Sequence, residues 1–246
     1  MLLGPELERL HKTIRVLDAS ILPFFEEKES GEHDLSWYVR RRITDLKFRC
    51  LDAIGESQVR ILKERGCPDS VVEKLRDQLG SAALGALVLD FPEGHLALLP
   101  VIPFSQRGIH DQMHAVYIKD KRGRSVLESE QIADGHTLPD RPYWILDAEI
   151  GETAVGFVKN SDEAKKLILS EARLPLVTPE IIALATHTGM VSDHILVAAD
   201  SWRKFSEQPM HHIGIISSNN DVWLGLVLES FPIVRVFPSC RERCVS

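Results

Sequence analysis

Apolar residues recur at helical spacing over the first third of the chain. The first series has steps of three and four residues and stops before Pro23, which predicts a helix with a core-facing stripe of Leu7, Leu10, Ile14, Leu17 and Ile21. After a polar, charged linker, Asp34 is placed to cap a second, long helix, whose stripe is Leu35, Val39, Ile43, Leu46, Cys50 and Ile54. This helix either continues through Gly55 or is interrupted there. A short third helix starts at Cys67-Pro68-Asp69, with Val71, Val72, Leu75 and Leu79 facing inward.

From about Gly80 the apolar positions form short runs rich in branched residues, separated by turn sequences such as F-P-E-G and L-P-D-R-P. These runs predict strands at 84–89, 96–102, 113–118, 143–146, 194–198, 212–216 and 222–228, with an edge strand at 233–237. The S-S-N-N-D sequence between the last two long runs predicts a hairpin. Two helices interrupt the strands, one at 162–171 and one capped by Thr178 with Pro179 at its first position. We therefore expect an α+β protein, with an N-terminal helical region followed by a mixed, mostly antiparallel sheet and two packed helices.

Composition supports a folded globular protein. Of 246 residues 44% are hydrophobic and 26% are charged, and no apolar run is long enough to cross a bilayer. The first ten residues lack the apolar segment of a signal peptide, so the expected compartment is the cytoplasm. The four cysteines form no C-x-x-C pair and are expected to be reduced; they are Cys50, Cys67, Cys240 and Cys244. The formal net charge of -7 argues against a general nucleic-acid binder. Most of the excess acid lies after residue 79, where 15 basic residues face 21 acidic ones.

Five motifs follow one another from Gln58 onward: Q-V-R-I-L-K-E-R-G-C-P, A-L-L-P-V-I-P, P-Y-W-I-L-D, L-P-L-V-T-P-E-I-I-A-L-A-T-H and V-W-L-G. In this order they resemble an uncharacterised family of bacterial proteins, a domain of unknown function. The resemblance covers roughly residues 57–246 and implies two parts, an N-terminal helical extension at 1–56 and an α+β domain at 57–246. The chain departs from the family pattern after Val197, and the closing Trp- and Gly-rich segment survives only as Trp223, Leu224 and Gly225. The family has no established activity to carry over.

Histidines and one carboxylate gather in the C-terminal part of the chain: His187, Asp193, His194, His211 and His212. They come from a helix end and two strand starts, and these converge if the strands are neighbours. Histidine with carboxylate is the usual make-up of a zinc, manganese or iron site or of a general-base pair. The catalytic candidates are His187, Asp193 and His194, and the metal candidates are His187, His194, His211 and His212. The alternative for His187 is a structural role, capping carbonyls in the last turn of its helix.

Two other polar motifs are weaker candidates. His110 and His114 have the spacing of a helical metal site, but the surrounding pattern favours a loop and a strand. Asp147 and Glu149 follow an apolar strand, where paired acids could bind a metal or act as acid and base. The interpretation we favour there is an exposed turn. The sequence contains neither a G-x-S-x-G elbow nor a phosphate-binding glycine loop.

A basic, partly aromatic patch lies on the second predicted helix: Trp37, Tyr38, Arg40, Arg41, Arg42, Lys47 and Arg49. The partner-binding candidates within it are Trp37, Arg40, Arg41 and Arg42. Such a patch could contact phosphate or an acidic partner, and the acidic C-terminal part of a second copy is one such partner. The alternative is an ordinary solvated helical face, in which Asp45 pairs with Arg49 one turn later.

Two functional hypotheses follow. The first is an interaction or structural module whose N-terminal helices mediate self-association or bind a protein partner. The second is a metal-dependent or acid-base hydrolase with a site near His187, Asp193, His194 and His211. We expect no membrane or nucleic-acid partner and no cofactor, and a divalent metal enters only with the second hypothesis.

Overall fold

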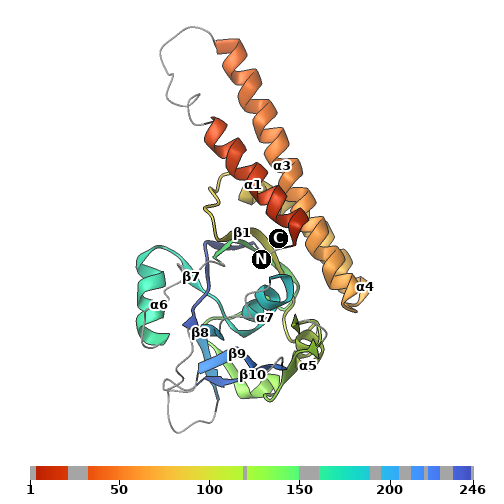
Figure 1. The fold of residues 1–246 in the computed structure, drawn as a ribbon, viewed down its shortest axis with the longest axis vertical. Coiled ribbons are helices and arrows are strands. Elements are labelled where there is room, and N and C mark those ends of the chain that lie inside the picture. Colours follow the sequence, from red (N-terminus) through yellow and green to blue (C-terminus); the bar gives the residue numbers. More distant parts are fainter. Residues whose placement is uncertain are drawn as a thin grey trace.

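The computed structural model describes residues 4–21, 33–118, 121–149, 161–188, 195–204, 212–218, 221–227 and 235–244, and these have the predicted α+β architecture (Figure 1). Three helices come first: α1 (Pro5–Ile21), α3 (His33–Glu64) and α4 (Asp69–Ala86). Helix α1 packs along α3, and the two project beyond the sheets. We call α1 together with residues 33–50 of α3 the arm. None of the described helices is long and apolar enough to cross a membrane.

Helix α3 continues through Gly55, the position at which the sequence allows an interruption. Gly55 lies against α4, and a Cβ atom added to it would be 2.1 Å from Cδ1 of Leu79. The glycine therefore allows two helices to approach closely and does not break either of them. The boundary expected after residue 56 falls inside this helix. As predicted, the inward face of α4 is buried, with Val71, Val72, Leu75 and Leu79 each at most 4% exposed.

The strands form two main sheets. The first is antiparallel, in the order β1 (His95–Val101), β6 (Tyr143–Glu149) and β13 (Glu242–Cys244). The second has the order β11 (Arg235–Val236), β8 (Ile195–Arg203), β9 (His212–Ser218), β10 (Asp221–Val227) and β4 (Arg124–Ser125), with β5 (Ile132–Asp134) also paired to β8. Two short ladders join β2 (Tyr117–Ile118) to β3 (Lys121–Arg122) and β7 (Leu174–Pro175) to β12 (Ser239–Cys240). The antiparallel pairing of β9 with β10 confirms the predicted hairpin partners.

Helices separate and cover these sheets. The remaining helices are α5 (Ile109–Met113), α6 (Ser161–Ser170) and α7 (Thr178–His187), with a 3₁₀ turn η1 at Ser129–Gln131. On one face of the first sheet, Leu98 and Trp144 join the core formed by α1, α3 and α4. On its other face Leu99 and Ile145 meet α7. Helix α6 covers the far side of the second sheet. Because β1 and β6 are covered on both faces, they read as continuous apolar runs.

Two predicted strands are wrong. The run at 84–89 is instead the last turn of α4 and the bend that follows it. Ala82, Ala83 and Ala86 continue the buried stripe of this helix, so the run has helical spacing that its leucines and valine obscure. The run at 113–118 begins at the end of α5 and contributes only Tyr117–Ile118 to a strand.

The start of α7 also differs from the prediction by one residue. Its N-cap is Val177, whose amide donates to Oε2 of Glu180 at 2.9 Å, so the carboxylate performs the capping expected of Thr178. The amide of Thr178 donates instead to Oγ of Ser201 on β8, at 2.9 Å. This contact fixes the beginning of α7 to the end of that strand. All ten residues of the helix are buried.

Candidate functional site

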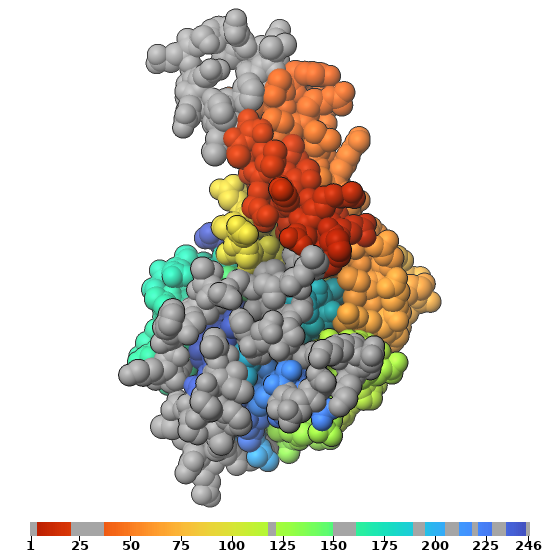
Figure 2. Space-filling view, viewed as in Figure 1, coloured from red at the N-terminus to blue at the C-terminus, as the bar shows by residue number. Residues whose placement is uncertain are grey.

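The outer part of α3, orange in Figure 2, lies at the surface of the molecule. It carries exposed aromatic and arginine side chains. Trp37 is 59% exposed and Tyr38 is 53% exposed. The guanidinium of Arg41 lies 5.4 Å from the ring centroid of Trp37, and that of Arg42 lies 5.5 Å from the Tyr38 ring. Both pairs are four residues apart, the spacing at which helical side chains meet. We call these four residues, with the 49%-exposed Leu46, the arginine–aromatic surface. Arg40 is half-buried and is the least accessible of the predicted partner-binding residues.

Lys47 does not belong to this surface. It is 6% exposed, and its Nζ lies 2.5 Å from Oδ1 of Asp18 and donates to the carbonyl of Leu89 at 2.8 Å. Burial raises the pKa of Asp18, an effect that the hydrogen bond and charge of Lys47 oppose. Lys47 therefore ties α1 and α3 to the body.

Beyond Lys47 the arm has no fully buried side chain among residues 15–20 and 37–46. The predicted core stripe of α3 is only half-buried at Val39 and Ile43 and is exposed at Leu46. Leu17, in the predicted core stripe of α1, is also only half-buried. The two helices of the outer arm thus shield each other incompletely, and apolar area remains available for a further contact.

His187, the centre of the predicted histidine cluster, is enclosed at the end of α7. Neither ring nitrogen has a hydrogen-bond partner among the described residues. Burial, with a contribution from the charge of Arg65, lowers the pKa of His187 to about 3, so the ring is neutral. Arg65 supplies the cap that we considered for the histidine, because its Nη1 donates to the carbonyls of Thr186 and Ala115, at 2.5 Å each.

The other members of the predicted cluster are not brought to His187. In the β8–β9 ladder His212 lies opposite Trp202. Trp202 follows Ser201, whose hydroxyl accepts the amide at the start of α7. His187 is the last residue of α7, which spans about 15 Å at the usual helical rise, so the two histidines lie at opposite ends of the helix. Asp193, His194 and His211 lie outside the described residues. Within the described ranges, no group of three His, Cys, Asp or Glu side chains is arranged to hold a metal ion.

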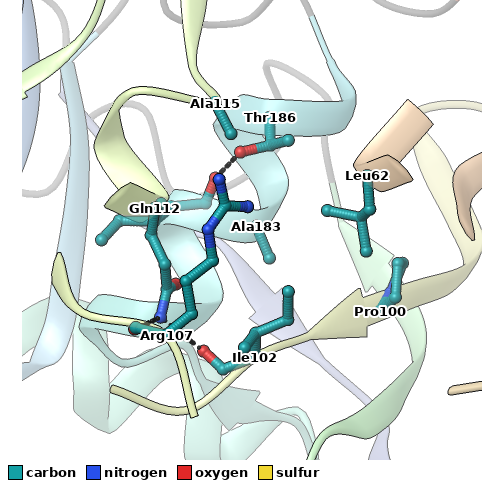
Figure 3. A pocket seen from close by; sticks show the side chains of 9 residues that line it. Leu62, Pro100, Ile102, Arg107, Gln112, Ala115, Ala183 and Thr186 are labelled. Atoms are coloured by element: carbon teal, nitrogen blue, oxygen red, sulfur yellow. Dashed lines mark hydrogen bonds between the residues drawn. The ribbon is translucent and has the colours of Figure 1, made fainter. Parts of the chain in front are cut away.

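A small pocket lies where α3, β1, α5 and α7 meet (Figure 3). Leu62, Ile102 and Ala183 give it apolar walls. The Gln112 amide nitrogen donates to the carbonyls of Ile102 and Arg107, at 2.9 and 2.7 Å. Since its polar side chains serve the backbone, we interpret this pocket as a packing gap between four elements.

Asp147 and Glu149 are buried, 2% and 8% exposed, so the exposed turn that we favoured is wrong. Arg173 enters from the segment before β7, where Nη1 donates to Oδ2 of Asp147 at 2.7 Å and Nη2 donates to its carbonyl at 2.6 Å. The Arg173 Nε donates to the hydroxyl of Ser239, which donates to Oε2 of Glu149 at 3.0 Å. Both acids therefore contact the same arginine, and they do so inside the protein.

His95 completes this centre from the start of β1. Its Nδ1 lies 2.5 Å from Oδ1 of Asp147, and Nε of Arg241 lies 3.8 Å from Oδ2. Sequence reasoning missed His95 and Arg173, which are 52 and 26 residues from Asp147 along the chain. The sequence shows a histidine at the start of an apolar strand and an arginine before the Leu-Pro-Leu sequence. Neither residue can be linked to Asp147 until the register of β1 with β6 is known.

Two further histidine–carboxylate pairs have different surroundings. His136 follows β5, and its Nδ1 lies 3.1 Å from Oδ2 of the buried Asp200, whose other oxygen accepts from Lys165. The Nε2 of His136 is enclosed and has no partner in the described part of the chain. His110 lies on α5, so the loop predicted there is wrong, but its ring is exposed and pairs with the exposed Glu128 at 3.0 Å.

Glu180 joins α7 to the first sheet. It is completely buried, and its carboxylate receives the hydroxyl of Tyr143 at 2.8 Å and Nε of Arg243 at 2.6 Å. Burial alone would lower the pKa of Arg243, but the bonds and charge of Glu180 raise it above its ordinary value. Burial, followed by the charge of Glu180, raises the pKa of the Cys240 thiol, which is therefore protonated and unreactive. All four cysteines are unpaired.

Comparison of the chain with models of protein families, with curated proteins and with solved structures finds no match. The resemblance carried by the ordered motifs therefore stays a prediction. The function has to be argued from the arm and from the polar centres.

Proposed function

We propose that the protein is an interaction module that self-associates through its arm. The observation that carries this proposal is the arginine–aromatic surface, in which Trp37 and Tyr38 are more than half exposed beside Arg41 and Arg42. Tryptophan, tyrosine and arginine are the residue types that most often dominate the free energy of protein interfaces. Here they lie on a rigid helix, so little conformational entropy is lost when they are covered.

The half-buried stripe of the outer arm supports the same proposal. Val39 and Ile43 on α3 and Leu17 on α1 remain partly exposed, and no residue beyond Lys47 in the described arm is fully buried. Covering this apolar area contributes about 25 cal/mol for each Å² removed from water. A second copy that packs against the arm would complete the core that the two helices lack.

Charge favours a second copy as the occupant. Within residues 33–50 five basic side chains face two acidic ones, and Lys47 is neutralised by Asp18. Residues 80–246 instead carry 21 acidic side chains against 15 basic ones. An arm resting on the body of its partner brings these opposite charges together. A two-fold arrangement makes that contact twice and closes the assembly.

Sedimentation velocity of the full chain over a wide range of concentration tests this proposal. We expect a monomer–dimer equilibrium that weakens with added salt, because the exposed charges are screened. Replacing Trp37 and Arg41 together by alanine should weaken the dimer by about 2 kcal/mol, or roughly 30-fold in the dissociation constant. Both side chains are exposed, so the fold should tolerate the change.

Trp202→Ala is the matched control. Trp202 is 42% exposed and lies at the end of β8, away from the arm, so the variant should dimerise like the parent protein. A monomer at every concentration and salt level would refute self-association. Loss of the dimer in the Trp202 variant, with the Trp37 and Arg41 variant unaffected, would assign the contact to a different surface.

A further inference from the structure

The His95–Asp147 pair has a geometry that self-association does not explain. Asp147 has φ 56°, a left-handed conformation that few residues other than glycine adopt. Such a conformation is unfavourable and persists only where its surroundings enforce it. Here Arg173 holds both the carboxylate and the carbonyl of Asp147. The result is a carboxylate turned within the buried strand toward His95.

The contacts of Asp147 determine which nitrogen of His95 carries the proton. Its Oδ2 accepts a hydrogen bond from Nη1 of Arg173 at 2.7 Å and lies 3.8 Å from Nε of Arg241, so this oxygen is surrounded by donors. Its Oδ1 then accepts a hydrogen bond from the Nδ1–H group of His95, 2.5 Å away. In the neutral ring this leaves the lone pair on Nε2. An enclosed acid that orients an imidazole in this way is the arrangement of general-base pairs.

Access to water distinguishes His95 from the other buried pair. The imidazole of His95 is 12% exposed, while its acid is 2% exposed. The Nε2 of His136, which also faces a buried aspartate, is enclosed. Arg241 is 48% exposed beside the same carboxylate. A partly exposed imidazole and an exposed guanidinium thus contact the two oxygens of one carboxylate, and the guanidinium has surface available for a ligand.

We propose that His95 is the general base of a hydrolytic site for small carboxylic esters, with Asp147 as its positioning residue and Arg241 facing the acyl oxygen. Nε2 takes a proton from a water molecule as the water oxygen bonds to the acyl carbon. Arg241 stabilises the negative charge that develops on the carbonyl oxygen. The bond from the acyl carbon to the alcohol oxygen then breaks, and the proton passes from Nε2 to that oxygen. The products are a carboxylic acid and an alcohol.

Release of p-nitrophenolate from p-nitrophenyl acetate by the full-length protein tests the proposal. Its leaving group departs as an anion, so the proton taken by Nε2 returns to solvent. His95→Gln should slow the reaction roughly tenfold or more, since general bases contribute about 10²–10⁴. Glutamine keeps an N–H group to donate to Asp147, so the variant should fold.

Two control variants separate the base from other histidines. His136→Gln removes the enclosed imidazole of a comparable pair, and His110→Gln removes an exposed imidazole paired with a surface acid. Both should keep the parent rate. A parent protein no faster than buffer, or a His95→Gln variant as fast as the parent, would overturn the proposal. So would a nitrogen NMR spectrum of the parent in which the neutral His95 carries its proton on Nε2.

Discussion

At the scale of single residues, the clearest property is the enclosure of His187. An unfolded chain protonates histidine near pH 6.5, whereas burial first, and the charge of Arg65 second, lower the pKa of this group to about 3 in the folded protein. The unfolded state therefore binds more protons between these two values. The stability that depends on the neutral ring is complete above pH 6.5 and is lost as the pH falls toward 3.

This argument predicts the behaviour of His187→Leu, which fills the site without a titrating group. Between pH 7.5 and pH 4.5 the parent should lose about 3 kcal/mol more stability than the variant, by linkage at roughly 1.4 kcal/mol per pH unit below 6.5. Urea unfolding at both pH values measures the difference. His114→Leu, which changes an exposed histidine, is the control and should behave like the parent. Equal pH dependence in parent and His187→Leu would show that the ring titrates normally.

Single residues also show where sequence reasoning stops. The pattern placed Asp147 and Glu149 together as paired acids, but it could not show that both contact Arg173 inside the protein. His95 and Arg173 approach Asp147 only after β1 pairs with β6 and the segment before β7 folds back. Lys47 belonged to a basic sequence run, but its long chain turns inward to Asp18. In each case a distant partner decides whether a charge is solvated or buried.

At the scale of elements, two helical glycines have opposite roles. Gly55 on α3 touches Leu79 so closely that an added methyl group would overlap it, whereas a Cβ atom on Gly80 of α4 would meet nothing within 4 Å. Gly55→Ala should therefore destabilise the protein by about 1–3 kcal/mol through overpacking, less the gain in helix propensity. Gly80→Ala should stabilise it by up to about 1 kcal/mol.

Thermal unfolding of the two alanine variants measures this contrast. In a double-mutant cycle, Leu79→Ala should relieve part of the strain of Gly55→Ala, so the two changes should be less than additive. Equal stabilisation of both glycine variants would contradict the close approach of α4 to Gly55, where an added Cβ atom would be 2.1 Å from Cδ1 of Leu79.

Apolar patterns predicted the long elements well, because each packs against a core on one face or, for β1 and β6, on both faces. Helices α3 and α4, strands β1 and β6 and the β9–β10 pair all follow their apolar patterns. The end of α4 was misread because its buried face is built from alanines, which carry little hydrophobic contrast. The cap of α7 was misplaced because Glu180 serves both the helix start and Arg243, a contact supplied by another sheet strand.

At the scale of the whole molecule, His11 joins the arm to the first sheet. The ring is 2% exposed; its Nδ1 donates to the carbonyl of Leu7 at 2.8 Å, and Nε2 accepts the amide of Ala97 on β1 at 3.0 Å. Burial lowers the pKa of His11, against the hydrogen bond to Leu7, and the charge of Arg15 lowers it further. Protonation would place a second donor against the Ala97 amide, so this contact is complete above pH 6.5 and is lost in acid.

Hydrogen exchange of α1 amides measures this docking directly. Protection in α1, corrected for intrinsic rates, should fall between pH 7 and pH 5 more than protection in α4, which has no histidine. His11→Gln, whose amide is not titrated, should show equal changes in both helices. Unchanged α1 protection in the parent across this range would contradict the role of His11.

The arm is anchored at Lys47, His11 and Ile14, and among residues 15–20 and 37–46 it buries no side chain completely. Its length is consequently not set by the packing of the body. Seven residues added to each helix of the outer arm would preserve the facing of the arm helices and move the arginine–aromatic surface outward by about 10 Å. The arm is thus a spacer whose reach can change while the sheets, and the polar centre at Asp147, stay as they are.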